Sequence, residues 1–166
     1  LRALLAGVGL QGEYFNNSDL TSLALTRTDP AIAFDWQRSS PFGSIGATDF
    51  SARWTGKVQP QFTQSYTFFT QADDGVRLWV NGKKLVDDWT DHSPAEHSGS
   101  VALTKGQLYD IRLEFYENFG TAVVQLFWRG PGFGRRVVPQ ANLYPYALVL
   151  TGEPPASARL RTRGSE

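Results

Sequence analysis

The sequence predicts an all-β domain, an antiparallel β-sandwich with long loops. Short runs of alternating apolar and polar residues recur about every ten residues, with turn residues between them, a pattern typical of sandwiches and barrels. Aromatic residues make up 13% of the chain, which also has 16 glycines, and this composition favours strands and turns over helices. No segment of ordinary helix length carries the apolar period of a helix.

The first half of the chain contains four expected strands separated by turns or loops. The segment 49–58 shows the pattern most clearly, because Phe50, Ala52 and Trp54 alternate with small or polar residues. The segment 39–47 is rich in Ser, Gly and Pro, which predicts a loop. The four strands are expected within 9–20, 31–36, 49–58 and 65–70.

A predicted hairpin organises the second half of the chain. Asn81 and Gly82 separate two strand-like segments, and both residues tolerate the positive φ of a type I′ turn. Apolar residues at every second position of 109–116 indicate a half-buried strand, whereas 122–128 has little polar content. The five strands are expected within 76–80, 84–89, 98–103, 109–116 and 122–128.

Composition limits the partners and the domain boundaries. The formal net charge is zero, which argues against nucleic acid and against electrostatic binding to membranes. No apolar run approaches twenty residues, so no transmembrane helix is predicted. Because the chain has no Met, even at position 1, we expect a module of a longer protein. We assign 9–148 to the domain, 1–8 to a preceding linker, and 149–166, rich in Pro, Ser, Gly and Arg, to a flexible tail.

Asp73 and Asp74 form the first candidate site, directly before Gly75 and the hairpin. One interpretation is a solvated turn, because Asp-Gly begins many hairpins. The other is a calcium site, since Ca²⁺ takes six to eight oxygen ligands from carboxylates, amides and carbonyls. Neighbouring side chains normally point to opposite faces of a strand, so shared chelation requires an unusual backbone between them, for instance a cis peptide.

Asn118 lies in a loop between two well-patterned strands. It is an ordinary turn residue unless this loop folds beside Asp73 and Asp74, where it would add a neutral oxygen ligand. Catalysis is not expected from the acidic pair. Glycosidases need two carboxylates that flank a cleft, and two adjacent aspartates suit that role poorly.

A second group of polar residues follows the hairpin. Asp87 and Asp88 are interpreted as loop-shaping or solvated residues. His92 and His97 lie in a polar loop, but without Cys or a third clear ligand they do not predict a zinc site.

A series of motifs in this order resembles the PA14 domain family. The resemblance covers roughly residues 10–145 and includes the acidic pair, the hairpin and a closing aromatic strand. The motifs are GEYF at 12–15, FSARWTG at 50–56, YTF at 66–68, ADDGVRLWVNG at 72–82, DDWTDH at 87–92, YDIRLEFYEN at 109–118, QLFW at 125–128 and LYP at 143–145. PA14 domains are β-sandwich modules of bacterial toxins, glycosidases, adhesins and yeast flocculins, and many bind carbohydrate in a calcium-dependent manner.

The resemblance implies a calcium site in this chain. The family's lectin members hold Ca²⁺ with two consecutive aspartates joined by a cis peptide, an Asn in a later loop, and carbonyls just after that Asn. The matching positions are Asp73, Asp74 and Asn118, with Gly120 and Ala122 as carbonyl donors. Such a set leaves the coordination shell incomplete, so vicinal hydroxyls of a sugar can replace water on the ion.

Residues near these loops in sequence are expected to form the rim of the sugar site. An aromatic side chain there could stack on the apolar face of a pyranose ring, although Trp89 could equally be a core residue. The expected rim residues are Gln71, Trp89, Asp91, His92 and Phe119.

These inferences lead to one expected function and one alternative. We expect a non-catalytic, monomeric, calcium-dependent module of a larger extracellular protein, which binds glycans or polysaccharides through vicinal hydroxyls. The alternative is a PA14 module without sugar affinity, which serves a structural or protein-interaction role within a larger enzyme or adhesin. Neither nucleic acid nor membrane insertion is part of either expectation.

Overall fold

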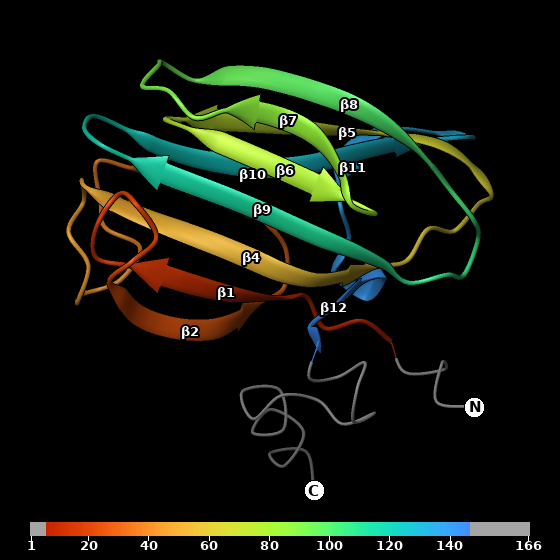
Figure 1. Cartoon of the computed structure of the whole chain (residues 1–166), viewed down its shortest axis with the longest axis horizontal. Coiled ribbons are helices and arrows are strands. Elements are labelled where there is room, and N and C mark those ends of the chain that lie inside the picture. Colours follow the sequence, from red (N-terminus) through yellow and green to blue (C-terminus); the bar gives the residue numbers. More distant parts are fainter. Residues whose placement is uncertain (1–5, 147–166) are drawn as a thin grey trace, which may run out of the picture.

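Two antiparallel β-sheets pack face to face in the computed structural model, which describes residues 6–146 (Figure 1). The strands are β1 Leu10–Phe15, β2 Leu23–Asp29, β3 Ala33–Gln37, β4 Phe50–Val58, β5 Gln64–Asp73, β6 Val76–Val80, β7 Lys83–Asp88, β8 Ala95–Leu103, β9 Tyr109–Glu117, β10 Ala122–Gly130, β11 Phe133–Val137 and β12 Leu143–Tyr144. One sheet has the order β2-β1-β4-β9-β6-β7, with β12 paired to β4. The other has the order β11-β10-β5-β8, with β3 paired to β10. The predicted all-β sandwich is confirmed.

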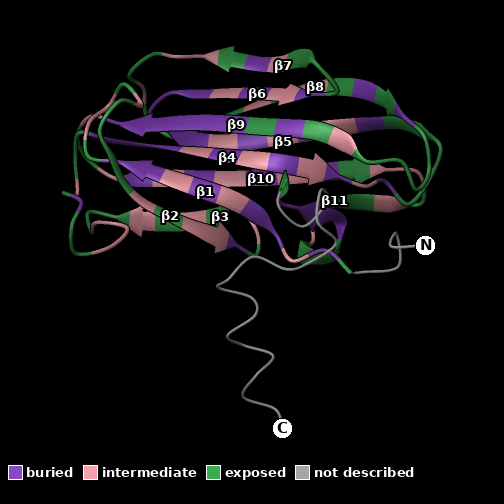
Figure 2. Ribbon diagram, turned by 60° about the horizontal axis from the view of Figure 1, so that its bottom comes forward, coloured by how far each residue is buried: buried purple, intermediate pink, exposed green. Residues whose placement is uncertain are grey.

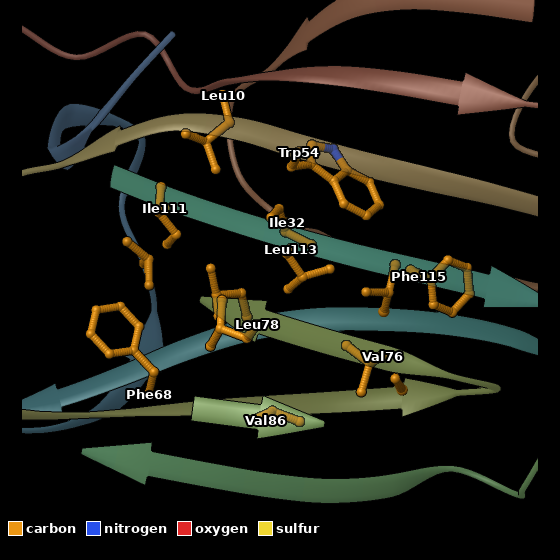
Figure 3. Packing of buried hydrophobic residues seen from close by; sticks show 14 of the residues in the cluster. Leu10, Ile32, Trp54, Phe68, Val76, Leu78, Val86, Ile111, Leu113 and Phe115 are labelled. Carbon is orange, nitrogen blue, oxygen red and sulfur yellow. The ribbon is translucent and has the colours of Figure 1, made fainter. Parts of the chain in front are cut away.

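The hydrophobic core fills the space between the two sheets. Alternate side chains of the central strands point inward, as the period of two predicts, and Trp54, Leu78, Leu113 and Phe68 belong to this core (Figure 3). The burial colours follow the same alternation, and β9 in the middle of its sheet is the most continuously buried strand towards its end (Figure 2). Burial of these large side chains stabilises the fold by roughly 1.5–3 kcal/mol each.

The hairpin predicted at the centre of the chain is present. Asn81 and Gly82 have φ values of 52° and 74°, the left-handed pair that a type I′ turn requires. The hairpin strands β6 and β7 pair with each other, and β6 also pairs with β9 through its other edge. This places the start of β6 beside the end of β9.

Three strands were not predicted: β2 and β11, which lie at sheet edges, and the two-residue β12, which pairs with β4. In β2 only Asp29 is fully buried, because this strand pairs on one side only, and Leu25 is only partly buried against the core. The strand β11 contains Arg135 and Arg136 and has no fully buried residue. Without a buried face, neither segment carries the apolar alternation on which strand prediction depends.

The buried Asp29 ties β2 to the strands beside it. Its carboxylate accepts hydrogen bonds from Tyr14 Oη at 2.5 Å, Trp54 Nε1 at 2.9 Å and Arg27 Nε at 2.8 Å. Charge-assisted hydrogen bonds offset the cost of burying this carboxylate. An edge strand with little apolar surface is thereby fixed to the core.

The first described residues already belong to the folded domain. Gly7 N donates to Ala141 O at 3.1 Å, and Val8 N donates to Leu143 O at 3.0 Å, within the segment 1–8 that we expected to be linker. Residues 1–5 of that segment and the predicted tail 149–166 lie outside the described residues. Among the described residues, no helix has the length and apolar character needed to cross a membrane.

Candidate functional site: a carboxylate cluster beneath an open cavity

Three connections meet at one end of the sandwich, namely β5–β6, β7–β8 and β9–β10 (left in Figure 1). The first contains Asp73, Asp74 and Gly75, and the peptide bond between the two aspartates is cis, as the resemblance implied. A Cβ at Gly75 would lie 2.1 Å from Cε1 of Tyr116, so only glycine fits at this position. The Asp-Asp-Gly sequence therefore packs directly against β9.

Asp74 holds the three connections together. Its Oδ1 accepts a hydrogen bond from the backbone N–H of His92 at 3.0 Å, and its Oδ2 accepts one from the N–H of Asn118 at 2.9 Å. Its own N–H donates to the carbonyl of Tyr116 at 3.1 Å. The position of Asp74 is thus fixed by both of the loops that border the site.

Three buried carboxylates lie together at this junction. Asp73 and Asp74 are 6% and 4% exposed, and Glu117, the last residue of β9, is fully buried. One oxygen from each lies within 4.8 Å of the others. Both oxygens of Glu117 lack a hydrogen-bond partner, and within residues 6–146 no Lys or Arg forms an ion pair with any of the three. Such a group of like charges is costly unless a cation joins it.

The pKa values of this cluster reflect burial and mutual repulsion. Burial, followed by the charges of Asp74 and Asp73, raises the pKa of Glu117 to about 9. Burial, followed by the hydrogen bond and charge of Asp74, raises the pKa of Asp73 to about 6. In the metal-free protein at neutral pH, Glu117 is therefore protonated.

Glu117 was missed in the sequence analysis, although the sequence contained a signal for it. The inward-facing positions of the predicted strand 109–116 were odd-numbered, from Tyr109 to Phe115. Extending the alternation by one more step places Glu117 on the buried face, where a glutamate without a partner is unusual. The strand was ended one residue too early, at Tyr116.

Asn118 lies at the site as predicted, but its amide is already engaged. Its Nδ2 donates to Asp91 Oδ1 at 2.9 Å, and the same oxygen accepts a hydrogen bond from Tyr116 Oη at 2.8 Å. The amide nitrogen therefore points towards Asp91, which leaves Oδ1 of Asn118 as the atom that could bind a cation. Asp91 thus orients the side chain that was predicted as a ligand.

The two predicted carbonyl donors lie beside the acidic pair. Gly120 has a φ of 95° and belongs to the β9–β10 loop. Ala122 begins β10, in which the next residue, Val123, pairs with Asp73 of β5. The register therefore places Ala122 near Asp73, and Gly120 lines the same cavity as Asp73.

An open cavity of about 450 Å³ lies above the carboxylate cluster. Phe119 projects at its rim and is 69% exposed, which is unusual for a phenylalanine that is not in contact with a partner. The cavity is lined by Arg38, Asp73, Asp74, Asp91, His92, Ser93, Pro94, Phe119, Gly120 and Thr121. It combines one exposed aromatic ring with many polar groups.

The structure separates the five predicted rim residues. Asp91, His92 and Phe119 line this cavity, whereas Gln71 lines an adjoining groove of about 390 Å³ that shares Pro94 and Thr121 with it. Trp89 lines neither. It packs edge-on against Tyr116, with the Arg77 guanidinium 3.8 Å from its ring centroid, and thus has a packing role.

Four residues of the cavity were not predicted, namely Arg38, Ser93, Pro94 and Thr121. Thr121 Oγ1 donates a hydrogen bond to Asp73 Oδ2 at 3.3 Å, and Arg38 follows β3, which pairs with the beginning of β10. Arg38 is far from the acidic pair in sequence and lies in an irregular loop, so no pattern could have placed it here. Thr121 falls between two residues that were predicted.

Comparison with known proteins agrees with the fold. The family model described as PA14 domain matches residues 7–142. The anti-sigma-I factor RsgI3 of Acetivibrio thermocellus is 45% identical over 139 residues, which cover 84% of this chain and 22% of that protein. The chain thus spans about a fifth of the length of this curated relative.

Solved structures of other proteins share this fold. The anti-sigma factor domain-containing protein from Clostridium clariflavum is 41% identical, with a TM-score of 0.80, covering 89% of this chain and 48% of that one. A PA14 sugar-binding domain from an RTX adhesin shares the fold with a TM-score of 0.72 at 17% identity, covering 84% of this chain and 99% of that one. The match to the family model extends over most of the chain, and the chain belongs to the PA14 domain family.

Proposed function

We propose that this chain is a calcium-dependent glycan-binding module of a larger extracellular protein. The observation that carries the proposal is the cluster of Asp73, Asp74 and Glu117 beneath an open, polar cavity. The two unbonded oxygens of Glu117 are the strongest single support, because a buried carboxylate without a partner is otherwise costly. A sugar-binding domain with the same fold adds support from outside this chain.

Calcium fits this cluster better than other common cations. Carboxylate oxygens are hard ligands, and the described part of the cluster offers neither sulfur nor imidazole nitrogen directed at Asp73 or Glu117. The Asn118 amide oxygen and the carbonyls of Gly120 and Ala122 would add neutral ligands. Calcium accepts six to eight oxygens in flexible geometry, whereas Mg²⁺ demands a near-ideal octahedron.

The cavity supplies the groups that a sugar would contact. Ligand positions that the protein leaves open on the ion can be taken by vicinal hydroxyls, while Asp91 and Arg38 offer hydrogen-bonding groups at the side. The exposed ring of Phe119 can cover the apolar face of a pyranose. The adjoining groove lined by Gln71 gives room for a further sugar unit of a polysaccharide.

Replacing Phe119 with alanine is expected to weaken glycan binding by about tenfold and to leave calcium affinity unchanged. The reason is that stacking contributes roughly 0.5–1.5 kcal/mol beyond area burial, while this side chain has no role in the carboxylate cluster. The measurement is calorimetric titration of glycan and, separately, of calcium.

The matched control is Phe62→Ala. Phe62 is also exposed, at 45%, but it precedes β5, at the end of that strand opposite Asp73. Glycan affinity should be unaffected in this variant. Equal losses in the two variants would show that the Phe119 ring is not a binding surface.

The alternative is a PA14 module that serves as a structural or protein-interaction unit. The chain spans 22% of one anti-sigma factor relative and 48% of another. Both candidate functions fit a unit of that size within a longer protein. The two functions differ in one property, because the alternative requires no sugar affinity with or without calcium.

A glycan array tests the proposal against this alternative. The chain is applied once with millimolar calcium and once with a chelator, since extracellular calcium modules bind with dissociation constants of about 10⁻⁴–10⁻³ M. Binding that appears only with calcium supports the proposal, and the array pattern identifies the sugar. Absence of binding in both conditions favours the structural module.

A further inference from the structure

A second polar cluster lies beside the β7–β8 loop and contains both histidines of the chain. Asp88 ends β7, His97 lies in β8, and His92 lies in the loop between these strands. Asp88 Oδ2 is 3.0 Å from His92 Nε2 and 2.8 Å from His97 Nε2. One oxygen atom thus faces two imidazole nitrogens.

The ring of His92 is held in one orientation by its other nitrogen. His92 Nδ1 lies 2.7 Å from the carbonyl oxygen of Ser93, and a carbonyl only accepts, so Nδ1 carries the hydrogen. In the neutral ring this leaves Nε2 with a lone pair. That lone pair faces a carboxylate oxygen of Asp88.

His92 Nε2 therefore lacks a suitable partner. The atom is buried and makes no hydrogen bond, although Asp88 Oδ2 is 3.0 Å away. The other oxygen of Asp88 accepts a hydrogen bond from Thr90 Oγ1, which fixes the carboxylate with Oδ2 towards the imidazoles. The lone pairs of His92 Nε2 and Asp88 Oδ2 therefore face each other at 3.0 Å and repel. A cation bound by both atoms would remove this repulsion.

We propose that Asp88, His92 and His97 form a binding site for a divalent transition-metal ion of the zinc class, separate from the carboxylate cluster. Two imidazole nitrogens and one carboxylate oxygen are a ligand set that zinc accepts, with water in the fourth position. Zinc-bound histidines usually donate their remaining ring N–H to a carbonyl or carboxylate, and His92 does so to Ser93.

Two of the three separations between ligand atoms require only a small adjustment to accept the ion, and all three ligand atoms lie within 4.8 Å of one another. Tetrahedral bonds of about 2.0–2.1 Å separate ligand atoms by about 3.3 Å, a few tenths of an ångström more than the two distances to Asp88 Oδ2. The side chains are 20%, 18% and 39% exposed for Asp88, His92 and His97, so an ion and a water molecule can enter from solvent. The sequence analysis lacked a third ligand for the two histidines, and Asp88 is that ligand.

The site also bears on the glycan cavity. The backbone N–H of His92 donates to Asp74, and His92 lines the cavity, so a metal ion on the His92 ring would stabilise the loop that separates the two sites. The hard oxygen ligands of one cluster and the imidazoles of the other suit different metal ions. The two sites can therefore be filled and tested independently.

The experiment is a titration of Zn²⁺ into the whole chain at saturating Ca²⁺, followed by calorimetry and by ¹⁵N NMR of the histidine rings. We expect one Zn²⁺ per chain with micromolar or tighter affinity, and shifts of the Nε2 resonances of both histidines. His97→Gln should weaken binding at least about 100-fold, because loss of a directly bound ligand exceeds the 10–100-fold cost typical of supporting residues. Asp88→Asn should have a comparable effect.

The control variant is Asp87→Asn. Asp87 is adjacent in sequence but pairs with Lys84 at 2.8 Å on the surface, so its replacement should leave Zn²⁺ affinity unchanged. Zinc binding that survives His97→Gln but disappears in Asp73→Asn would place the ion in the carboxylate cluster and overturn the proposal. Histidine resonances that stay unchanged up to millimolar Zn²⁺ would also overturn it, and a proton would then be what joins Asp88 to His92.

Discussion

Asp73→Asn is expected to lower calcium affinity by at least about 100-fold and to abolish calcium-dependent glycan binding. Replacement of residues that merely support a metal ligand already costs about 10–100-fold, and Asp73 would bind the ion directly. Within residues 6–146 the side chain accepts a hydrogen bond only from Thr121 outside the acidic cluster, so the change to the fold should be small. Calorimetric titration of calcium and the glycan array measure the two effects.

Asp73 is a better choice than Asp74 for this experiment. Asp74 accepts hydrogen bonds from the backbone N–H groups of His92 and Asn118, so its replacement would disturb both loops. A loss of calcium binding could then not be distinguished from a change in the fold. Asp87→Asn again provides the control, because it removes one exposed carboxylate of the β6–β7 hairpin that follows Asp73 in the chain and should change neither affinity. Retained glycan affinity in Asp73→Asn would contradict the assignment of the calcium site.

Glu117→Gln is expected to stabilise the calcium-free protein while it weakens calcium binding. At pH 7 the calcium-free fold must keep Glu117 protonated, with a pKa raised by burial and by Asp74 to about 9. From the ordinary value of 4.5, this costs on the order of 3 kcal/mol at pH 7, which a neutral glutamine of the same shape avoids. The unfolding temperature of the calcium-free variant should therefore lie about 6–12 °C above that of the calcium-free wild type.

The stability difference between the variant and the wild type should narrow when calcium is added. Calcium at about 100 times its dissociation constant stabilises the wild type by about 2.7 kcal/mol. The variant has lost one negative ligand and gains less from the same concentration. A purely structural role for Glu117 would give a destabilised variant in both conditions, which would contradict its assignment to the metal site.

The same carboxylates predict how stability depends on pH in the calcium-free protein. The folded pKa of Glu117 lies above its unfolded value, so the folded state binds more protons between about 4.5 and 9. The contribution of Glu117 to the free energy of unfolding is therefore greatest below about pH 4.5. It is lost as the pH rises towards about 9. Asp73, with a pKa of about 6, adds a second loss of stability at lower pH, which is complete once the pH has risen above about 6.

Thermal unfolding at a series of pH values checks this dependence. In Glu117→Gln the decline above about pH 6 should be largely absent, because Asp73 alone remains with a raised pKa. With saturating calcium the decline should disappear in the wild type, since the ion favours the ionised carboxylates. A wild-type stability that rises between pH 6 and 9 without calcium would be inconsistent with an unpaired Glu117.

The parts of the fold that were predicted from sequence are those with one buried face. The central hairpin followed from Asn81-Gly82, and β4 and β9 followed from clear alternation. The edge strands β2 and β11 were missed because they bury too little apolar surface to leave a pattern. Strand order and sheet assignment came from the structure, since sequence periodicity carries no information on which strands pair.

The candidate site was predictable to a similar degree. Asp73, Asp74 and Asn118 stood in recognisable motifs, and Glu117 was within reach of the strand pattern. Arg38 reaches the cavity from a loop that is distant in sequence, and the Asp88–His92–His97 cluster forms because the β7–β8 connection folds back on itself. Such contacts are products of the topology, and they become visible only once the sandwich has been assembled.

The most direct test of this account is a calorimetric titration of Ca²⁺ into the wild-type chain at pH 7 in buffers of different ionisation enthalpy. We expect one ion per chain, a dissociation constant of about 10⁻³ M or lower, and release of protons, because Glu117 must ionise as calcium enters. Asp73→Asn should show neither heat nor proton release. Absence of binding in the wild type at several millimolar calcium would contradict the central claim that the carboxylate cluster is a calcium site.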